Sequence, residues 1–284
     1  MAIRTRSALL GAAACAALLA VEWFAAFHVG FFRHADQSIY QQFGDLQTHT
    51  GVESVAHWLV SVFDPNPYVY LVVAVLAVTL LRRRPWSACA VLAIVLGASV
   101  STELLKHVVT APRAGSLFPG GISPVSPSSW PSGHSTAAMA LVLAAVIAVP
   151  ARLRPAAAAL GAVLAVAVGY SVLATGIHYP SDVLGGFLMA TMWALATVAA
   201  LRVAERWRPS PGRWDREQVS IRAALGAPGA VLLAALVLTV IVLISHPHDV
   251  VSYARAHEAF VIGATGIAAL GLALSTGVLL SVRR

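Results

Sequence analysis

The sequence alternates between long apolar runs and short polar stretches. A run of about 20 apolar residues is long enough for a helix to cross the hydrocarbon core of a bilayer. By this measure the pattern predicts eight membrane-spanning helices. They lie near residues 7–28, 67–81, 86–107, 133–150, 156–177, 182–204, 227–245 and 258–281. The stretch 52–63 also has helical spacing of apolar residues, but it is short, which favours an interfacial or tucked helix over a span.

The composition agrees with a membrane protein. Of the 284 residues, 58% are hydrophobic and 11% are charged, and the mean hydropathy is +0.79. Soluble domains carry about 25% charged residues, so this chain lacks the charge that a water-facing surface needs. We therefore expect an all-α integral membrane protein. The basic start "MAIRTR" is typical of a signal peptide, but the apolar run continues to about His28, which predicts a retained first helix.

Basic residues are distributed unevenly between alternate loops. With the N-terminus in the cytoplasm, fifteen of the 19 Lys and Arg residues fall in inner segments, as the positive-inside rule requires. The outer segments hold only Arg33, Lys106, Arg113 and Arg255. We therefore expect a multi-pass protein of the cell (plasma or inner) membrane with both termini cytoplasmic. The net charge of +7 then reflects membrane sidedness, so the expected partners are membrane lipids and no nucleic acid is implied.

Cations and a helix start meet at the outer helix ends. "STELLKHVVTAPRAG" contains Lys106, the only lysine of the chain, and Arg113 seven residues later. "PSGH" places Ser132, Gly133 and His134 at the start of a predicted helix. A helix N-terminus presents unpaired N–H groups and partial positive charge, which together bind anions. These residues can also serve as an ordinary helix cap and interfacial polar residues.

A third stretch, "SVLATGIHYPSDVLGG", carries His178 and Asp182 four residues apart. The carboxylate can accept from one imidazole nitrogen and leave the other free as a nucleophile or base. All ten histidines of the chain fall in outer segments or at outer helix ends. Two histidines, a carboxylate, two cations and a helix N-terminus are sufficient for phosphoryl transfer, because positioning and charge stabilisation carry most of that reaction. No metal or other cofactor is expected.

"KHVVTAPR", "PSGH" and "HYPSD" resemble, in order and spacing, the three motifs of the type 2 phosphatidic acid phosphatase family. The resemblance covers roughly residues 60–205 and points to the membrane lipid phosphatase branch. It implies a six-helix phosphatase core. It also implies action, without a metal, on lipid phosphates or lipid pyrophosphates at the outer (extracytoplasmic) face of the cell membrane.

The resemblance also implies a role for each matched residue. His178 would be the nucleophile that forms a phosphohistidine, and Asp182 would orient it. His134 would be the general acid and then the base for water. The phosphoryl oxygens would be held by the remaining matched residues, Lys106, Arg113, Ser132 and Gly133.

The third motif departs from the family pattern at one position. The family has Ser-Arg where this chain has Ser171-Val172, so the second phosphate-binding arginine is missing. Loss of one transition-state donor costs about 10²–10³ in rate. Arg33 and Arg255 are candidate cations that could compensate for the missing arginine.

Two alternatives to a phosphatase remain open: a phosphotransferase that uses the same histidine, and a degenerate member that binds lipid phosphate heads or acts as a membrane scaffold.

We expect three regions: a phosphatase-like helical domain over 1–206 with motifs at 106–113, 131–134 and 171–182, a basic cytoplasmic loop over 207–226, and two additional transmembrane helices over 227–284. Glu103 is expected to pair with Lys106 or His107 on one helix face. Glu22 within the first span fits either a packing contact or a substrate-head contact. The Gly-, Pro- and Ser-rich loop 114–131 fits a cover over the site or a plain connector.

Overall fold

The computed structural model describes residues 2–48, 50–109, 128–207 and 220–283, and the regular structure within these ranges is helical. The α-helices are α1 (Ala2–His28), α2 (Gly30–Gly44), α3 (Thr50–Val62), α4 (Pro65–Leu81), α5 (Pro85–Val108), α6 (Gly133–Ala148), α7 (Arg154–Ala174), α8 (Pro180–Trp207), α9 (Ile221–Ser245), α10 (Pro247–Ala256) and α11 (Glu258–Val282). Two short 3₁₀ helices, η1 (Asp45–Thr48) and η2 (Ala151–Leu153), join α2 to α3 and precede α7.

The predicted all-α membrane architecture is confirmed. In the described ranges six helices, α1, α5, α7, α8, α9 and α11, are long and apolar enough to cross a membrane, with η2 included in the span of α7. A seventh candidate is the bent pair α3–α4, and the shorter apolar helix α6 corresponds to the span predicted at 133–150. The chain is therefore a multi-pass membrane protein.

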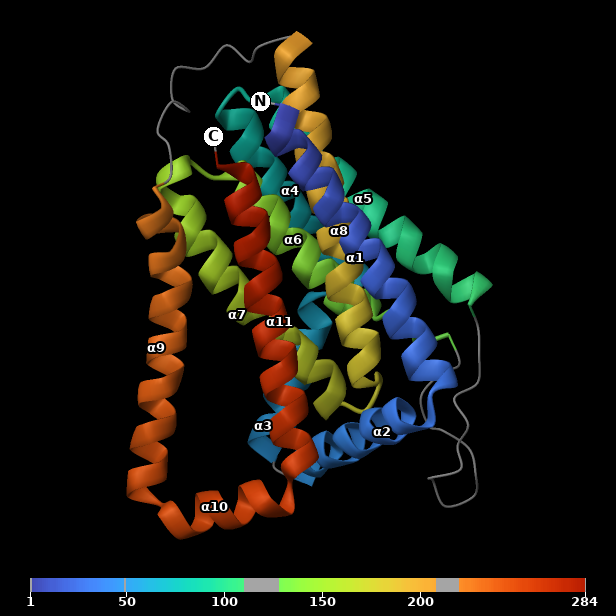
Figure 1. Cartoon of the computed structure of the whole chain (residues 1–284), viewed down its shortest axis with the longest axis vertical. Coiled ribbons are helices and arrows are strands. Elements are labelled where there is room, and N and C mark those ends of the chain that lie inside the picture. The colour runs from blue at the N-terminus through green and yellow to red at the C-terminus, as the bar shows by residue number, and fades with distance from the viewer. Residues whose placement is uncertain (1, 49, 110–127, 208–219, 284) are drawn as a thin grey trace.

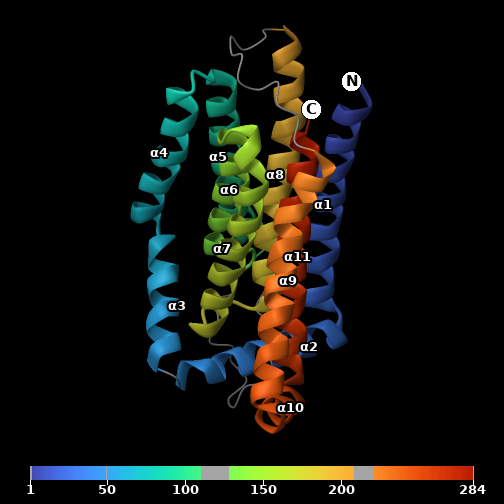
Figure 2. The same cartoon turned by 90° about the vertical axis from the view of Figure 1, so that its left-hand side faces the viewer.

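The structure adds detail at three places. The stretch 52–63, predicted as a short interfacial or tucked helix, lies in the short helix α3, which is bent by 63° from α4 at a short break, as in a broken span or a re-entrant loop (Figure 2). The helices α2 and α10 lie in segments for which the sequence analysis predicted no helix. For α2 the reason is physical: its buried residues include Asp36 and Gln37, so an apolar period could not reveal its packed face.

The helix α6 forms the centre of the bundle. Nearly all of its residues from Ser135 to Ala148 are buried, because α5, α7 and α8 pack around it. Small residues permit this close packing, since a Cβ at Gly161 of α7 would lie 2.3 Å from a methyl group of Val142. The core therefore holds the N-terminus of α6 in a fixed position against α5 and α8.

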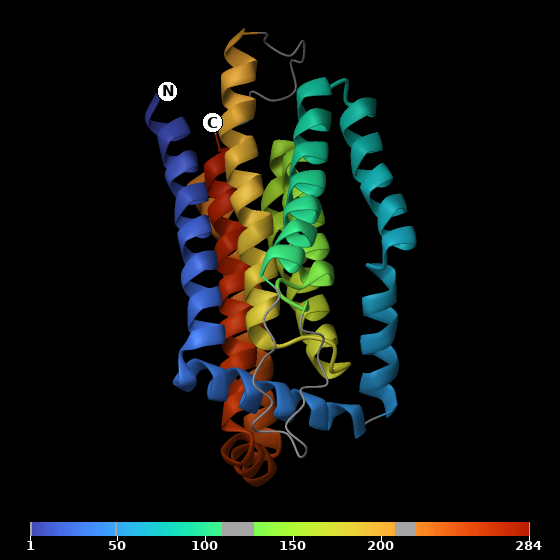
Figure 3. The same ribbon diagram turned by 90° about the vertical axis from the view of Figure 1, so that its right-hand side faces the viewer.

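The two ends of the bundle differ. Both chain termini lie at one end, and α2 and α10 lie at the other (Figure 1). The helix α2 runs across that second end beneath α8 (Figure 3). At the first end Arg82 donates to the carbonyl of Ala148, the last residue of α6, at 2.5 Å, and Arg202 donates to the carbonyl of Ser281 near the end of α11. Arginines at helix C-termini satisfy carbonyl groups that lack partners within the helix.

Candidate functional site

The turn between α7 and α8 carries His178. The helix α7 ends in a Schellman arrangement, in which Gly176 adopts φ 70° and Ile177 N–H donates to the carbonyl of Val172 at 3.2 Å. A positive φ suits glycine, so this sequence turns sharply at that point. The chain then re-enters a helix at Pro180, which is favoured at a helix start. The sharp turn places His178 beside the first turn of α8.

Asp182 orients the His178 ring. Its carboxylate is fully buried, and Oδ2 lies 3.2 Å from Nδ1 of His178. The same oxygen accepts the backbone N–H of Tyr179 at 2.9 Å. A buried carboxylate needs such donors to offset its lost hydration. The hydrogen bond at Nδ1 leaves Nε2 as the nitrogen that can act on a substrate.

The start of α6 packs directly against this turn. Ser132 caps the helix, with Oγ accepting the N–H of Ser135 at 3.3 Å. The Ser132 N–H donates to the backbone carbonyl of Asp182 at 2.9 Å. A Cβ at Gly186 of α8 would lie 2.9 Å from the Ser132 carbonyl oxygen, so only glycine permits this close approach. The helix start and the His178 turn are therefore fixed relative to one another.

The lysine of α5 reaches the same place. Lys106 Nζ lies 3.3 Å from the position that a Cβ on Gly133 would occupy. It also forms an ion pair with Glu103 at 2.8 Å, which confirms the predicted pairing on this helix face. An ammonium group beside the N-terminus of α6 gives that location a concentrated positive charge.

The two histidines face one another across the site. The ring centroids of His134 and His178 are 6.4 Å apart, with the ring planes at 67°. The Nε2 atom of His134 lies 3.1 Å from Oδ1 of Asp64, at the break between α3 and α4. The sequence analysis missed Asp64, although one acidic residue between two apolar helical stretches was a signal for it.

The structure does not bring all predicted residues together. Arg113 and most of the 114–131 loop lie outside the described residues. Val172 is fully buried in the apolar core, which leaves no cation at the position of the family's second arginine. Arg33 on α2 and Arg255 on α10 are both exposed, and α10 packs mainly against α9 and α11. No hydrogen bond or ion pair joins either guanidinium to a site residue in the described part of the chain.

The helix α2 supports the His178 turn through residues that the sequence analysis did not select. Asp36 accepts both the N–H and the Oγ–H of Ser181 at 2.8 Å, inside the protein. Tyr40 donates to the carbonyl of Gly176 at 3.1 Å. Burial and the neighbouring Tyr179 raise the pKa of Tyr40, which keeps this hydroxyl a donor.

Glu22 has a packing role in this structure. Its Oε2 accepts the indole N–H of Trp130 at 2.9 Å. The ring of Trp130 also packs beside Gly185, where a Cβ would lie 2.8 Å from the indole nitrogen. The pair ties α1 to the segment immediately before "PSGH". Of the two roles considered for Glu22, the structure therefore favours the packing contact.

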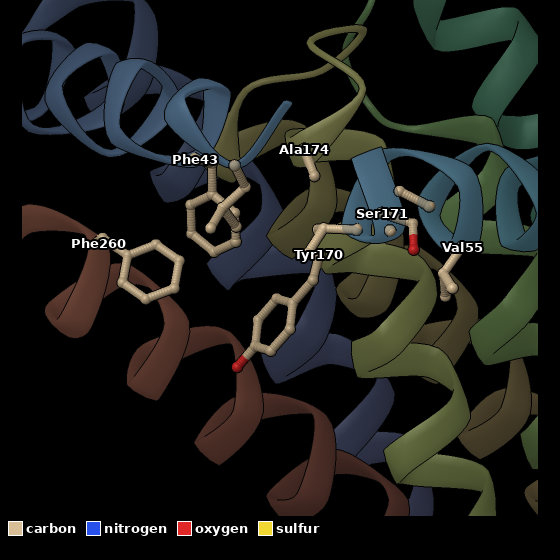
Figure 4. Close-up of a pocket in the computed structure, with 10 residues that line it drawn as sticks. Phe43, Val55, Tyr170, Ser171, Ala174 and Phe260 are labelled. Atoms are coloured by element: carbon tan, nitrogen blue, oxygen red, sulfur yellow. The ribbon is translucent and has the colours of Figure 1, made fainter. Parts of the chain in front are cut away.

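An apolar cavity of about 360 Å³ lies near the end of α7, away from the charged groups. Phe43, Val55, Tyr170, Ser171 and Phe260 are among its lining residues, which come from α2, α3, α7 and α11 (Figure 4). Neither histidine of the site contributes to its wall. The cavity is therefore distinct from the group of polar residues at the start of α6.

The described residues contain no group of three or more His, Cys, Asp and Glu side chains that could hold a metal ion.

The geometry of the site defines a class of protein: helical membrane proteins with paired histidines, a carboxylate and a lysine at a helix N-terminus. The sequence model of the PAP2 superfamily matches residues 68–206, from the first turn of α4 to the end of α8. This match supports membership of the PAP2 superfamily for a region that makes up a little under half of the chain.

A solved structure with a similar fold is described as the "first transmembrane PAP2 type phosphatidylglycerolphosphate phosphatase from Bacillus subtilis". The TM-score is 0.54 at 20% sequence identity, and the similarity covers 70% of this chain and 98% of that one. This chain therefore contains nearly the whole fold of that neighbour and additional polypeptide. No curated protein matches the sequence.

Proposed function

We propose that this protein is a phosphatase of lipid phosphates or lipid pyrophosphates that works through a phosphohistidine at His178. The observation that carries the proposal is the pair of facing imidazole rings, one of which is bound at Nδ1 by the buried Asp182. Membership of the PAP2 superfamily and the fold of the phosphatidylglycerolphosphate phosphatase support it.

In the first half-reaction, Nε2 of His178 attacks phosphorus and the bond from phosphorus to the leaving oxygen breaks. The protonated ring of His134 donates a proton to that oxygen. Lys106 and the N–H groups at Gly133 neutralise charge on the remaining phosphoryl oxygens. To bind them, Lys106 exchanges its contact with Glu103 for the phosphate, which is the stronger anion.

In the second half-reaction, the now neutral His134 takes a proton from water as the water oxygen attacks phosphorus. The nitrogen–phosphorus bond breaks, inorganic phosphate leaves, and His178 regains its lone pair. The protein residues supply charge stabilisation and proton transfer in both steps, so the proposed reaction needs no metal.

We further propose that the site opens toward the outer side of the membrane. The support is the distribution of basic residues, since fifteen of the 19 lie in segments on the side of the termini. Lys106 and the two histidines fall on the opposite side in this arrangement. A lipid phosphate in the outer leaflet can then present its head to the site.

The test is phosphate release from a panel of lipid phosphates, including phosphatidylglycerol phosphate, phosphatidate and polyprenyl pyrophosphate, by purified protein in detergent with EDTA. We expect release that vanadate inhibits and that is absent from His178→Ala. Absence of release from the folded wild-type protein would instead favour the degenerate binding role that Val172 raises. Phosphate transfer to an added alcohol in preference to water would favour the phosphotransferase.

A further inference from the structure

The break between α3 and α4 holds an acidic residue. Asp64 lies between the two helices, where the candidate span bends by 63° partway along the bundle (Figure 2). Ionisable groups and broken helices within membrane proteins gather where substrates or protons are handled. Asp64 also precedes the residues 68–206 that match the superfamily.

Asp64 occupies the N-cap position of α4 without capping it. An N-cap aspartate normally accepts the N–H of the second or third helical residue. Here the sequence is "DPNP", so Pro65 and Pro67 have no N–H to donate at the first and third positions, and the side chain makes no capping bond. The carboxylate instead contacts His134, with Oδ1 3.1 Å from Nε2.

Packing between α4 and α6 fixes this contact. Tyr68, one turn after Asp64, donates its buried hydroxyl to the carbonyl of Ala137, one turn after the start of α6, at 3.2 Å. Tyr68 also packs against Phe63, with ring centroids 6.2 Å apart. The first turns of the two helices are therefore tied together, and the pair of Asp64 and His134 is set by the core.

Several charged groups face His134 from the surrounding elements. They are Asp64 at the N-cap of α4, Lys106 from α5 and His178 from the turn before α8, while Glu103 and Asp182 are the partners of Lys106 and His178. Each carboxylate contacts a different basic group: Glu103 pairs with Lys106, Asp182 with His178, and Asp64 with His134.

We propose that Asp64 is a positioning residue for His134 in the phosphoryl-transfer reaction. It holds Nε2, which leaves Nδ1 to give its proton to the leaving oxygen and later to take one from water. The inference rests on the proposed function. The Asp64 carboxylate, with Oδ1 3.1 Å from Nε2, supplies a counter-charge for the imidazolium that the acid step requires. The arrangement parallels Asp182 and His178, with one carboxylate for each histidine.

The test compares Asp64→Asn, which removes the charge and keeps the shape, with Asp64→Glu, which keeps the charge. The matched control is Asp45→Asn, because Asp45 Oδ2 also faces a histidine, His257, at 3.9 Å outside the site. The pH dependence of kcat is measured with an alkyl lipid phosphate. The burst of 4-nitrophenol is measured with 4-nitrophenyl phosphate, whose leaving group needs no protonation.

For Asp64→Asn we expect kcat on the lipid phosphate to fall about tenfold while KM changes less than twofold. The alkaline limb of the pH profile should move about one pH unit lower, because the imidazolium has lost its counter-charge. The 4-nitrophenol burst should be nearly unchanged, Asp64→Glu should recover most of the rate, and Asp45→Asn should behave as wild type.

An unshifted alkaline limb in Asp64→Asn, or equal losses on the two substrates, would overturn the inference, because a structural role alone produces those results. If the wild-type protein releases no phosphate from any substrate, the proposed function fails separately. The histidine titration by NMR then decides about Asp64. The His134 signal, assigned with His134→Gln, must titrate at lower pH in Asp64→Asn than in wild type, and an unchanged midpoint would contradict the inference.

Discussion

At the scale of single residues, carboxylates contact both histidines of the candidate site. Asp182 is fully buried and accepts both the His178 ring and the Tyr179 N–H. An uncompensated charge in that location would be costly, so the ring and the carboxylate stabilise one another. Such preorganisation removes the need to reorient groups during the reaction.

Replacing Asp182 with Asn tests this role. Both contacts are made by Oδ2, so an amide oxygen in that place can still accept the Tyr179 N–H and the Nδ1–H of His178, but the amide carries no negative charge. We expect kcat to fall about 10³–10⁴-fold because the neutral amide no longer stabilises the positive charge that the His178 ring gains when Nε2 bonds to phosphorus. Phosphate release at saturating lipid phosphate measures the effect. A loss below tenfold, in a variant with unchanged thermal stability, would show that the Asp182 charge does not assist the reaction.

The missing cation at Val172 gives a second prediction, which concerns Arg33 and Arg255 as the two candidates to compensate for it. Arg33 lies one helical turn before Asp36 and Gln37, two of the buried residues of α2, and so on the same side of the helix as Asp36, which contacts Ser181 after the His178 turn. We expect Arg33→Ala to lower kcat/KM about tenfold, and Arg255→Ala, on the peripheral α10, to leave it unchanged. Full activity in the Arg33 variant would contradict compensation by that residue.

At the scale of the elements, the contact of α6 with α8 controls the geometry of the site. Gly186 permits it, since a Cβ there would lie 2.9 Å from both the Ser132 carbonyl oxygen and the Thr136 nitrogen. Backbone atoms cannot move aside as a flexible side chain can, so a methyl group at this position must separate the two helices.

We therefore expect Gly186→Ala to reduce phosphatase activity at least tenfold and to destabilise the protein by about 1–3 kcal/mol. Gly266→Ala is the matched control, because Gly266 also lies within a helix and has nothing within 4 Å of the added carbon. Thermal unfolding in detergent and phosphate release are measured for both variants. A Gly186 variant as active and stable as the control would show that the two helices do not need this close contact.

The contact between α2 and α8 through Asp36 and Ser181 is a second feature at this scale. Asp36→Ala leaves the buried N–H and hydroxyl of Ser181 without their acceptor, which costs about 1–3 kcal/mol for each unsatisfied group. Ser181→Ala removes only the hydroxyl bond and keeps the N–H bond. We expect the unfolding temperature to fall more for Asp36→Ala than for Ser181→Ala. Equal unfolding temperatures for the two variants would contradict a stabilising role for both hydrogen bonds of Asp36.

At the scale of the whole molecule, the candidate site lies on a buried helical core. The last two long helices, α9 and α11, differ in how closely they pack against that core. The helix α11 packs closely against α7 and α8, and Ser275 of α11 donates to the carbonyl of Ala158 at 2.8 Å in the interior. The helix α9 is almost entirely exposed along its length, as expected for a helix that faces lipid. Of the two additional helices, α11 is therefore part of the packed bundle and α9 is peripheral.

The sequence was sufficient to predict the long apolar helices, because their length and composition alone distinguish them. It also selected the polar residues at the helix ends of one side, since groups such as Lys106 and His178 are conspicuous beside apolar runs. It could not predict α2, whose packed face is polar, or Asp64, whose role appears only when the bend brings α4 beside α6. Contacts between distant segments leave no local pattern in a single sequence.

The orientation of the bundle can be tested directly. In a variant with Cys15 and Cys89 replaced by alanine, single cysteines are introduced at Arg255 on α10 and at Arg152 beside α7, both exposed and at opposite ends. We expect a membrane-impermeant thiol reagent to label Arg255→Cys on intact cells and Arg152→Cys only after lysis. The reverse pattern would place the site on the cytoplasmic side.

The most direct test of the central claim is rapid quenching of the purified protein with a lipid phosphate labelled with ³²P. We predict an acid-labile, base-stable label on the protein that peptide mapping assigns to His178, and that forms and decays as fast as phosphate is released. The label should be absent from His178→Ala. Phosphate release without any such label, or a label on another residue, would contradict the account.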